Sequence, residues 1–350
     1  MNTLVVGGAG FIGSNVAAAR LKRGETVTVF DNLSRKGARE NLLWLETLGA
    51  SRLRVVLGDA RRDARKLRSE VAGAGAIYHL AGQVAVTTSL IDPEGDLEAN
   101  LGSTLVLLEA MRAVRSQAAL VFASTNKVYG SLASASTILH DGRWDYSDGR
   151  PGVSEREPLD FHSPYGCSKG AADQYVRDFG RVYGLHTIVF RQSCIYGPRQ
   201  FGVEDQGWLV HFILAHAFGR LVKIFGDGRQ VRDALFIDDL IAAFDLAESR
   251  AGELAGEAFN IGGGRANSLS ILELLDLLER HFGRRVETSF APWREADQRV
   301  FISDNSRVEA TLGWRAQVSV ADGLKRTIGF VSEHLALFSE TLERKPGVPR

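Results

Sequence analysis

Short, almost continuously apolar segments alternate with helical patterns through the first half of the chain, and this alternation most restricts the fold. Helical patterns occupy 13–24 and 102–116. Segments that are apolar along their whole length are typical of strands buried on both faces. Alternation of such strands with helices predicts an α/β fold with a doubly wound parallel sheet. The expected strands are 3–8, 26–31, 53–59, 76–82, 119–125 and 187–193.

The pattern changes after residue 193, where helices mix with short strands and turns. Segments 233–249 and 257–264 look like a return to the sheet. We therefore expect two interleaved parts. A nucleotide-binding domain would comprise 1–193 and about 233–262, and a smaller C-terminal substrate-binding region about 194–232 and 263–345. Ligands of such sheets bind beyond the carboxyl ends of the strands.

The first predicted strand runs into GGAGFIG, in which Gly7, Gly10 and Gly13 follow the spacing G-x-x-G-x-x-G. Glycines here allow a tight turn and the close approach of a pyrophosphate to backbone N–H groups, and the helix that follows favours an anion at its N-terminus. Alone, the spacing would also fit a plain glycine-rich turn. Its place between a strand and a helix favours a Rossmann-type dinucleotide site.

Acidic residues end the next two predicted strands. A carboxylate at Asp31 would accept hydrogen bonds from the adenosine ribose and repel a 2′-phosphate, which favours NAD over NADP. Arg35 follows closely and weakens that choice slightly. Asp59 could meet the adenine amine. The alternative for each acid is a loop carboxylate or a helix cap.

The segment SPYGCSKGAADQY places Tyr165 and Lys169 four residues apart, on one face of a predicted helix. A nearby ammonium favours phenolate over phenol, so this tyrosine could take a proton from a sugar hydroxyl. The alternative is a surface helix pair. Thr125, at the end of an upstream strand, favours the catalytic interpretation because its hydroxyl can bridge the substrate oxygen and Tyr165.

Together these residues resemble the extended short-chain dehydrogenase/reductase superfamily, which includes NAD-dependent sugar-nucleotide epimerases and dehydratases. The resemblance runs from Asn2 to about residue 330. It implies a catalytic set of Thr125, Tyr165 and Lys169, with Ser124 as the second candidate for the hydroxyl. It also implies a tightly bound, recycled NAD. The expected cofactor-binding residues are Gly7, Gly10, Phe11, Ile12, Gly13, Asp31, Asn32, Asp59, Ala60, Leu80, Ala81, Gln83, Asn100, Tyr165 and Lys169.

The two residues after Thr125 separate this chain from one branch of the superfamily. Sugar-nucleotide 4,6-dehydratases typically carry Asp-Glu there, and that pair removes water from the sugar. This chain has Asn126 and Lys127, and neither an amide nor an ammonium replaces a carboxyl group well in that role. The two side chains could instead orient substrate hydroxyls or phosphate, or only cap the strand and close the loop.

The longer motifs STNKVYG (124–130) and DFHSPYGCSKGAADQ (160–174) resemble the subfamily of CDP-paratose 2-epimerases, also called CDP-tyvelose epimerases. This resemblance implies inversion at C2 of a CDP-linked hexose or deoxyhexose through a transient 2-ketone, with return of the hydride. Arginine pairs well with phosphate oxygens, although surface ion pairing with nearby acids is the alternative. The expected substrate-binding residues are Ser124, Asn126, Lys127, Gln206, Arg232, Arg294 and Arg299.

Other functions stay open at this point. One alternative is another sugar-nucleotide epimerase of the same fold, acting at C4 or on a UDP- or GDP-linked sugar. Cys194 argues against a simple UDP-galactose 4-epimerase, because those enzymes usually have an asparagine at this place. A reductase that releases NAD(P)H would fit Asp31 poorly. A non-catalytic NAD-binding regulator would have no need of Thr125, Tyr165 and Lys169 together.

Composition indicates the remaining partners. Lys plus Arg and Asp plus Glu both number 42, so no global field draws the chain to nucleic acid or to an acidic membrane. No apolar run is long enough for a membrane span, and two cysteines fit a reducing cytoplasm. No spacing of His, Cys and acids suggests a metal site. The family resemblance implies a homodimer or homotetramer, assembled through helices corresponding to 102–116 and 168–182.

Overall fold

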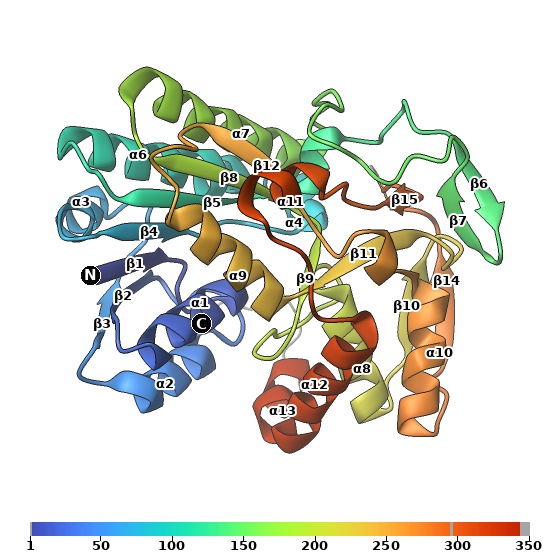
Figure 1. The fold of residues 1–350 in the computed structure, drawn as a ribbon. Helices are drawn as coiled ribbons and strands as arrows, with labels where there is room; N and C mark the ends of the chain where they lie inside the picture. Colours follow the sequence, from blue (N-terminus) through green and yellow to red (C-terminus); the bar gives the residue numbers. More distant parts are fainter. Residues whose placement is uncertain (1, 295–296, 344–350) are drawn as a thin grey trace.

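The computed structural model describes residues 2–294 and 297–343 (Figure 1). Within these residues a sheet of seven strands has the order β12-β8-β5-β4-β1-β2-β3. Each neighbouring pair in it is parallel. The doubly wound parallel sheet expected from the sequence is therefore confirmed. Its strands are β1 (Asn2–Val6), β2 (Thr26–Asp31), β3 (Leu53–Leu57), β4 (Ala76–His79), β5 (Ala119–Thr125), β8 (Thr187–Gln192) and β12 (Glu257–Ile261).

Helices cover both faces of this sheet (Figure 1). Successive strand residues point to opposite faces, so Val121 packs in one apolar cluster and Leu120 in the other. The first cluster takes residues from α1 (Phe11–Lys22), α2 (Ala38–Gly49) and α9 (Ile237–Glu248). The second takes residues from α3 (Ala64–Ala72), α6 (Ser103–Ala113) and α7 (Ser163–Tyr183).

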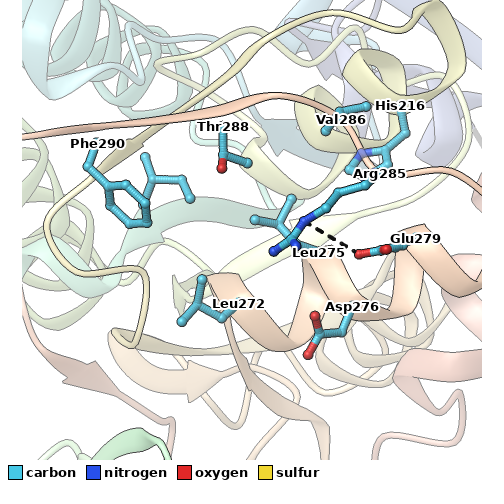
Figure 2. A pocket seen from close by; sticks show the side chains of 10 residues that line it. His216, Leu272, Leu275, Asp276, Glu279, Arg285, Val286, Thr288 and Phe290 are labelled. Carbon is cyan, nitrogen blue, oxygen red and sulfur yellow. Dashed lines mark ion pairs between the residues drawn. The ribbon is translucent and has the colours of Figure 1, made fainter.

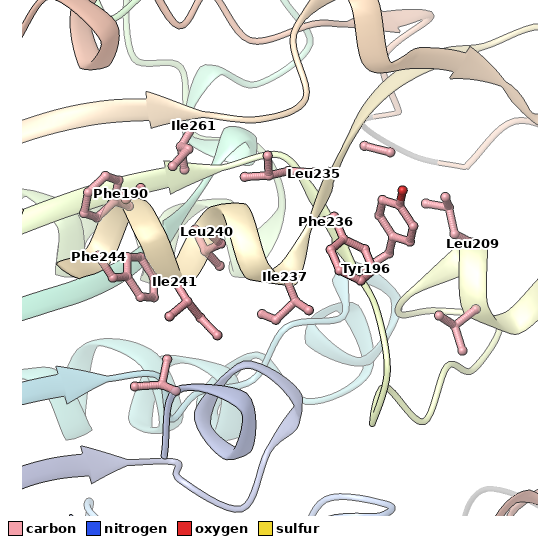
Figure 3. Packing of buried hydrophobic residues seen from close by; sticks show 14 of the residues in the cluster. Phe190, Tyr196, Leu209, Leu235, Phe236, Ile237, Leu240, Ile241, Phe244 and Ile261 are labelled. Carbon is pink, nitrogen blue, oxygen red and sulfur yellow. The ribbon is translucent and has the colours of Figure 1, made fainter. Parts of the chain in front are cut away.

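The packing of α9 shows how the C-terminal part is joined to the sheet (Figure 3). Leu240, Ile241 and Phe244 of α9 lie in the same cluster as Phe190 of β8 and Ile261 of β12. The rings of Phe190 and Phe244 are 5.2 Å apart between centroids. Burial of such large apolar side chains stabilises the fold by about 1.5–3 kcal/mol for each one. Residues 237–261 therefore belong to the core of the large sheet.

A smaller sheet lies beyond the carboxyl ends of the large one. In it β11 pairs with β9 and β15 in parallel and with β13 in antiparallel fashion. The sequence predicted that residues 233–249 return to the large sheet. Their helical part does so as α9, which packs on that sheet, but residues 233–236 pair within the smaller sheet as β11, so the prediction is wrong for them. The physical reason is that β11 finds its partners in the smaller sheet. These strands are β9 (Cys194–Tyr196), β11 (Val231–Phe236), β13 (Ser268–Ser270) and β15 (Val300–Phe301).

Most of the remaining C-terminal elements lie to the side of the large sheet, around the smaller strands (Figure 1). Two further strand pairs are β6 (Thr137–His140) with β7 (Arg143–Tyr146), and β10 (Val222–Phe225) with β14 (Thr288–Ala291). Short helical turns are α4 (Val86–Ile91), α5 (Pro93–Leu97), the π-helical η1 (Glu98–Gly102), and the 3-10 turns η2 (Asn126–Tyr129) and η3 (Arg265–Asn267). The C-terminal helices are α8 (Trp208–Phe218), α10 (Ile271–Phe282), α11 (Ser306–Leu312), α12 (Val320–Glu333) and α13 (Leu335–Glu343). Among the described helices, none combines the length and apolar character needed to cross a membrane.

Candidate active site

The glycine turn between β1 and α1 leaves no room for a side chain at Gly7 or at Gly13. Gly7 has φ +82°, and a Cβ there would lie 2.5 Å from the backbone nitrogen of Ala81. A Cβ on Gly13 would lie 2.2 Å from the carbonyl oxygen of Gly7. Gly10 precedes α1 without a side-chain cap on the helix. The backbone N–H groups of the turn and of the N-terminus of α1 are therefore not covered by side chains at these glycines. Such an arrangement fits the pyrophosphate of a dinucleotide.

The carboxylate of Asp31 lies beside this turn. It accepts hydrogen bonds from the backbone N–H of Ala9 at 3.0 Å and of Leu33 at 2.8 Å. Burial raises the pKa of this carboxyl group, whereas the backbone hydrogen bonds oppose the rise. Asp31 is therefore fixed in place at the end of β2, where the ribose of a bound dinucleotide would meet it.

Other expected cofactor residues have partners within the chain. Asp59 pairs with Arg61 at 2.6 Å, and the hydrogen bonds of this arginine hold the pKa of the carboxyl group well below its usual range. Asn32 donates to the same carboxylate at 3.3 Å. Phe11 and Ile12 open α1 and pack against the large apolar cluster. Ala60, Leu80 and Ala81 lie at the ends of β3 and β4.

Asp31→Asn should lower the affinity for NAD by about 10- to 100-fold, because a hydrogen bond to a charged acceptor is lost. The ratio of NAD to NADP affinity should fall as well, because the amide does not repel a 2′-phosphate. Titration of the cofactor-free protein with each dinucleotide, followed by protein fluorescence, measures both effects. Asp148→Asn, in the surface turn beside Arg150, is the control. An unchanged affinity for NAD would contradict the role of Asp31.

The three expected catalytic residues converge above the sheet. Thr125 ends β5, and its side chain is hydrogen-bonded to the hydroxyl of Tyr165 on α7. Lys169 lies one turn further along α7. Its ammonium donates to the carbonyl oxygen of Ala123 at 2.5 Å and lies 4.4 Å from the ring centre of Phe122. The side chains at all three positions are buried.

Burial changes the proton affinity of both titratable groups. It raises the pKa of Tyr165 to about 12, against the hydrogen bond from Thr125, and lowers the pKa of Lys169 to about 8. Arg35 also acts on Tyr165 by lowering its pKa, whereas Asp96 raises it. An influence of Lys169 on Tyr165 stays a prediction, because the ammonium is directed at Ala123.

A buried polar network holds the start of α7, and sequence reasoning identified only part of it. Asn100 of the π-helical turn donates to Ser168 at 2.9 Å, and Ser168 donates to Asp96 at 2.5 Å. Gln83 donates to the same carboxylate at 2.9 Å. Asn100 and Gln83 thus support the helix that carries Tyr165 and Lys169. Asp96 was missed, although its spacing four residues before Asn100 could have indicated a shared helix face.

Ser124 does not share the position of Thr125. Its hydroxyl donates to Asp173 at 2.8 Å, and Asp173 also receives two hydrogen bonds from Arg191, at 2.9 and 3.0 Å. Successive strand residues face opposite sides, so Ser124 points away from the position of Thr125 and contacts Asp173 of α7. The structure places Thr125, and not Ser124, in the lining of the cavity described next.

A cavity of about 290 Å³ opens beside Thr125 and Tyr165. Asn126 and Lys127 line it from the end of β5, and Cys194 lines it beside Trp208, whose indole nitrogen donates to the thiol at 3.3 Å. The outer wall comes from the C-terminal segments, with Arg232, Arg294 and Asp297 among its residues. One cavity therefore joins the hydroxyls of Thr125 and Tyr165 to several cations.

The expected substrate-binding arginines differ in position. Arg232 pairs with Asp297 at 2.5 Å inside the cavity lining. Arg294 pairs with Glu204 at 3.3 Å and with Asp205 at 3.2 Å, and it lies over the ring of Phe225. Arg299 is exposed and stacks on Trp144, away from the lining. Gln206 accepts a hydrogen bond from Arg35 at 2.7 Å and so connects the cofactor side to this region.

Two histidines and a second hollow lie outside this arrangement. His79 is buried, and burial lowers its pKa to about 3, so it is a neutral core residue bonded to Thr104. His162 pairs with Asp160 at the surface. A hollow of about 120 Å³ lies between α8, α10, β10 and β14, and its lining includes none of the three residues expected to be catalytic (Figure 2). The described part of the chain contains no cluster of His, Cys and acids able to hold a metal ion.

Comparisons with known proteins agree with this geometry. Residues 3–262 match the model of the NAD dependent epimerase/dehydratase family. CDP-paratose 2-epimerase of Salmonella typhi is 44% identical over 339 residues, which covers 95% of this chain and 99% of that protein. UDP-glucose 4-epimerase of Mycolicibacterium smegmatis is 34% identical, with 94% and 98% covered.

Solved structures give the same fold. UDP-glucose 4-epimerase of Thermotoga maritima, solved with UDP-glucose, superposes with a TM-score of 0.82 at 32% identity, covering 96% of this chain and 100% of that chain. UDP-glucuronic acid 4-epimerase from Bacillus cereus, solved with UDP-glucuronic acid and NAD, also gives 0.82 at 27% identity, covering 95% and 99%.

Proposed function

The chain belongs to the NAD-dependent epimerase/dehydratase family, and we propose that it inverts C2 of a CDP-linked hexose or deoxyhexose. The expected family, the use of NAD and the epimerase activity are confirmed. The position of inversion and the base of the nucleotide are the proposed part. They are supported by the 44% identity to a CDP-paratose 2-epimerase along nearly the whole of both chains.

One observation carries the choice of epimerisation over dehydration. Asn126 and Lys127 both line the cavity directly beside Thr125 and Tyr165, where elimination of water would need an acid and a carboxylate base. The carboxylates in the lining are engaged elsewhere: Asp297 pairs with Arg232, and Glu204 and Asp205 pair with Arg294. The site therefore offers Tyr165 and Thr125 for proton transfer at a sugar hydroxyl, but it offers no unpaired carboxyl group in the described cavity lining to eliminate water.

The chain's own residues supply binding and proton transfer. Gly7, Gly10, Gly13 and Asp31 would hold the dinucleotide at the cradle described above. NAD, when bound, supplies an acceptor that can take a hydride from a carbon and return it. Tyr165 would take the proton of the C2 hydroxyl and later give it back, with the Thr125 hydroxyl orienting the oxygen between them.

This chemistry suits C2 of a glycosyl phosphate. The hydrogen at C2 is not acidic, because C1 is locked as an acetal and offers no adjacent carbonyl group. Direct removal of that hydrogen as a proton would be too slow, whereas a transient ketone at C2 allows the sugar to present its other face. The buried site of Tyr165 and Thr125 also keeps water away from the ketone.

A CDP-hexose deuterated at C2 tests the proposal. In ordinary water without added cofactor, the purified enzyme should give the C2 epimer with the deuterium retained, as followed by NMR. A product without deuterium would mean exchange with solvent and would contradict hydride return. Inversion at C4, or a 4-keto product, would move the chain to another branch of the family.

The 4-epimerase alternative is supported by the 34% identity to a UDP-glucose 4-epimerase and by the structural neighbours.

Assembly and location are also part of the proposal. A homodimer or homotetramer is supported by exposed apolar side chains on the two helices expected to pair, namely Leu105, Tyr175, Val182 and Tyr183. A cytoplasmic location is supported by two cysteines that form no disulfide.

A further inference from the structure

We infer that the ammonium of Lys127 binds the phosphate that is attached to the sugar, and that this contact sets which carbon lies beside Tyr165. The inference rests on the proposed function, because it names the group in the substrate that Lys127 recognises. It gives a role to a residue that sequence reasoning left between orienting the substrate and simply closing the loop.

The proposed reaction brings the phosphate on C1 close to the hydroxyls of Thr125 and Tyr165. C2 is bonded directly to C1, the carbon that carries the phosphate, whereas C4 lies across the ring from C1. An enzyme that oxidises C2 must therefore hold this phosphate much closer to its catalytic tyrosine than an enzyme that oxidises C4. A cation attached to the same strand end as the catalytic hydroxyl would meet this need.

Lys127 stands at this place. It follows Thr125 by two residues in η2, and its backbone N–H donates to the Thr125 hydroxyl at 3.2 Å. The side chains of Lys127 and Thr125 thus project from a single hydrogen-bonded turn. Both line the cavity with Tyr165. Among the cations in the described cavity lining, Lys127 is the one in the turn that directly follows the strand of Thr125.

Asp297 links Lys127 to a second cation. Its Oδ1 lies 3.6 Å from the Lys127 ammonium and accepts from Arg232 at 2.5 Å. All three side chains are half-buried or nearly buried, with 22%, 21% and 11% of the Lys127, Asp297 and Arg232 side chains exposed. Two cations around one carboxylate leave a net positive charge at the cavity wall, which a phosphate would balance.

The electrostatics of the cluster keep this arrangement compatible with a charged lysine. Burial lowers the pKa of Lys127, Asp297 raises it, and Arg232 lowers it again. A doubly charged diphosphate next to the ammonium would add to the effect of Asp297 and favour the charged form. Arg294, by contrast, pairs with two carboxylates, Glu204 and Asp205, so its charge is already balanced within the chain.

Lys127→Met tests the inference, because it removes the charge and keeps most of the side-chain volume. Calorimetric titration of the NAD-loaded enzyme with CMP and with CDP compares ligands that differ by the second phosphate. We expect an affinity for CDP about 10- to 100-fold lower than in the unmodified enzyme, and the same affinity for CMP. Lys127→Arg should recover much of the affinity for CDP. Lys66→Met, on the exposed face of α3, is the control.

Two results would overturn the inference: unchanged CDP affinity in Lys127→Met, or equal losses for CMP and CDP. NAD content and thermal stability show whether the variant is folded, and Lys127→Gln provides a second neutral variant. Titration with UMP and UDP keeps the comparison valid for a uracil-specific site. The result depends only on the difference in affinity between the nucleoside monophosphate and diphosphate, and not on which carbon of the sugar reacts. The deuterium experiment on the unmodified enzyme decides separately whether C2 is the reacting carbon.

Discussion

Tyr165→Phe should lower kcat by about a thousandfold, the usual range of a lost general acid–base group, while the chain keeps its fold and its NAD. The phenol oxygen is hydrogen-bonded to Thr125 in a buried site, and phenylalanine fills the same space without a group that can carry the proton. Turnover followed by NMR with a CDP-hexose measures the loss. The NAD content of the purified variant shows that the cofactor site is intact.

A matched control lies on the same helix. Tyr175 of α7 has 44% of its surface exposed and is absent from the cavity lining. Tyr175→Phe keeps the ring that the proposed contact between subunits would bury, so it should keep the activity within about twofold. Activity of Tyr165→Phe within tenfold of the unmodified enzyme would show that another group transfers the proton. A variant without NAD would instead show that Tyr165 is needed to hold the cofactor.

Arg191→Met should destabilise the protein by about 3–5 kcal/mol, because removal of one partner from a buried ion pair leaves the other charge uncompensated. Arg191 is 3% exposed and Asp173 is fully buried, and two hydrogen bonds join them between β8 and α7. Arg191 also donates to the hydroxyl of Tyr129 at 3.1 Å. Urea unfolding of the NAD-loaded protein measures the change in free energy.

Two further variants separate the buried charge from general damage. Arg177→Met, on α7, removes an arginine whose hydrogen bonds within the described residues go to two neutral groups, the carbonyl of Gly256 and the side chain of Gln174, and it should cost much less stability. The double variant Arg191→Met with Asp173→Asn should be more stable than Arg191→Met alone, because the buried charge is gone. A loss below about 1 kcal/mol in Arg191→Met would contradict the importance of the pair.

The sequence predicted the features of the fold that depend on short continuous segments. Apolar strands alternating with helices indicated the large sheet, and each of the six expected strands overlaps a strand of that sheet. The glycine spacing indicated a turn in which a Cβ at Gly7 or Gly13 would meet backbone atoms. The four-residue spacing of Tyr165 and Lys169 placed both on one buried helix face. Each of these properties depends on residues that are close in the chain, so local pattern is sufficient.

Contacts between segments that are distant in the chain could not be predicted from local sequence patterns. The smaller sheet that contains β11 was missed, because an apolar strand does not show which partner it will pair with. Ser124 and Thr125 are neighbours, yet only the packing of α7 shows that one meets Asp173 and the other meets Tyr165. Arg299 has the same charge as Arg232, yet it stacks on Trp144 outside the cavity lining.

By itself, therefore, the sequence determined the large sheet, the tight glycine turn and the helix that carries Tyr165 and Lys169, since each follows from the periodicity and sterics of one continuous segment. Only the tertiary structure decided which charges share the cavity. Lys127, Arg232 and Asp297 come from three separate segments, and their spacing depends on how β5, β11 and the loop before β15 pack. Electrostatic interaction depends on separation in space and on burial, and neither is set by separation along the chain.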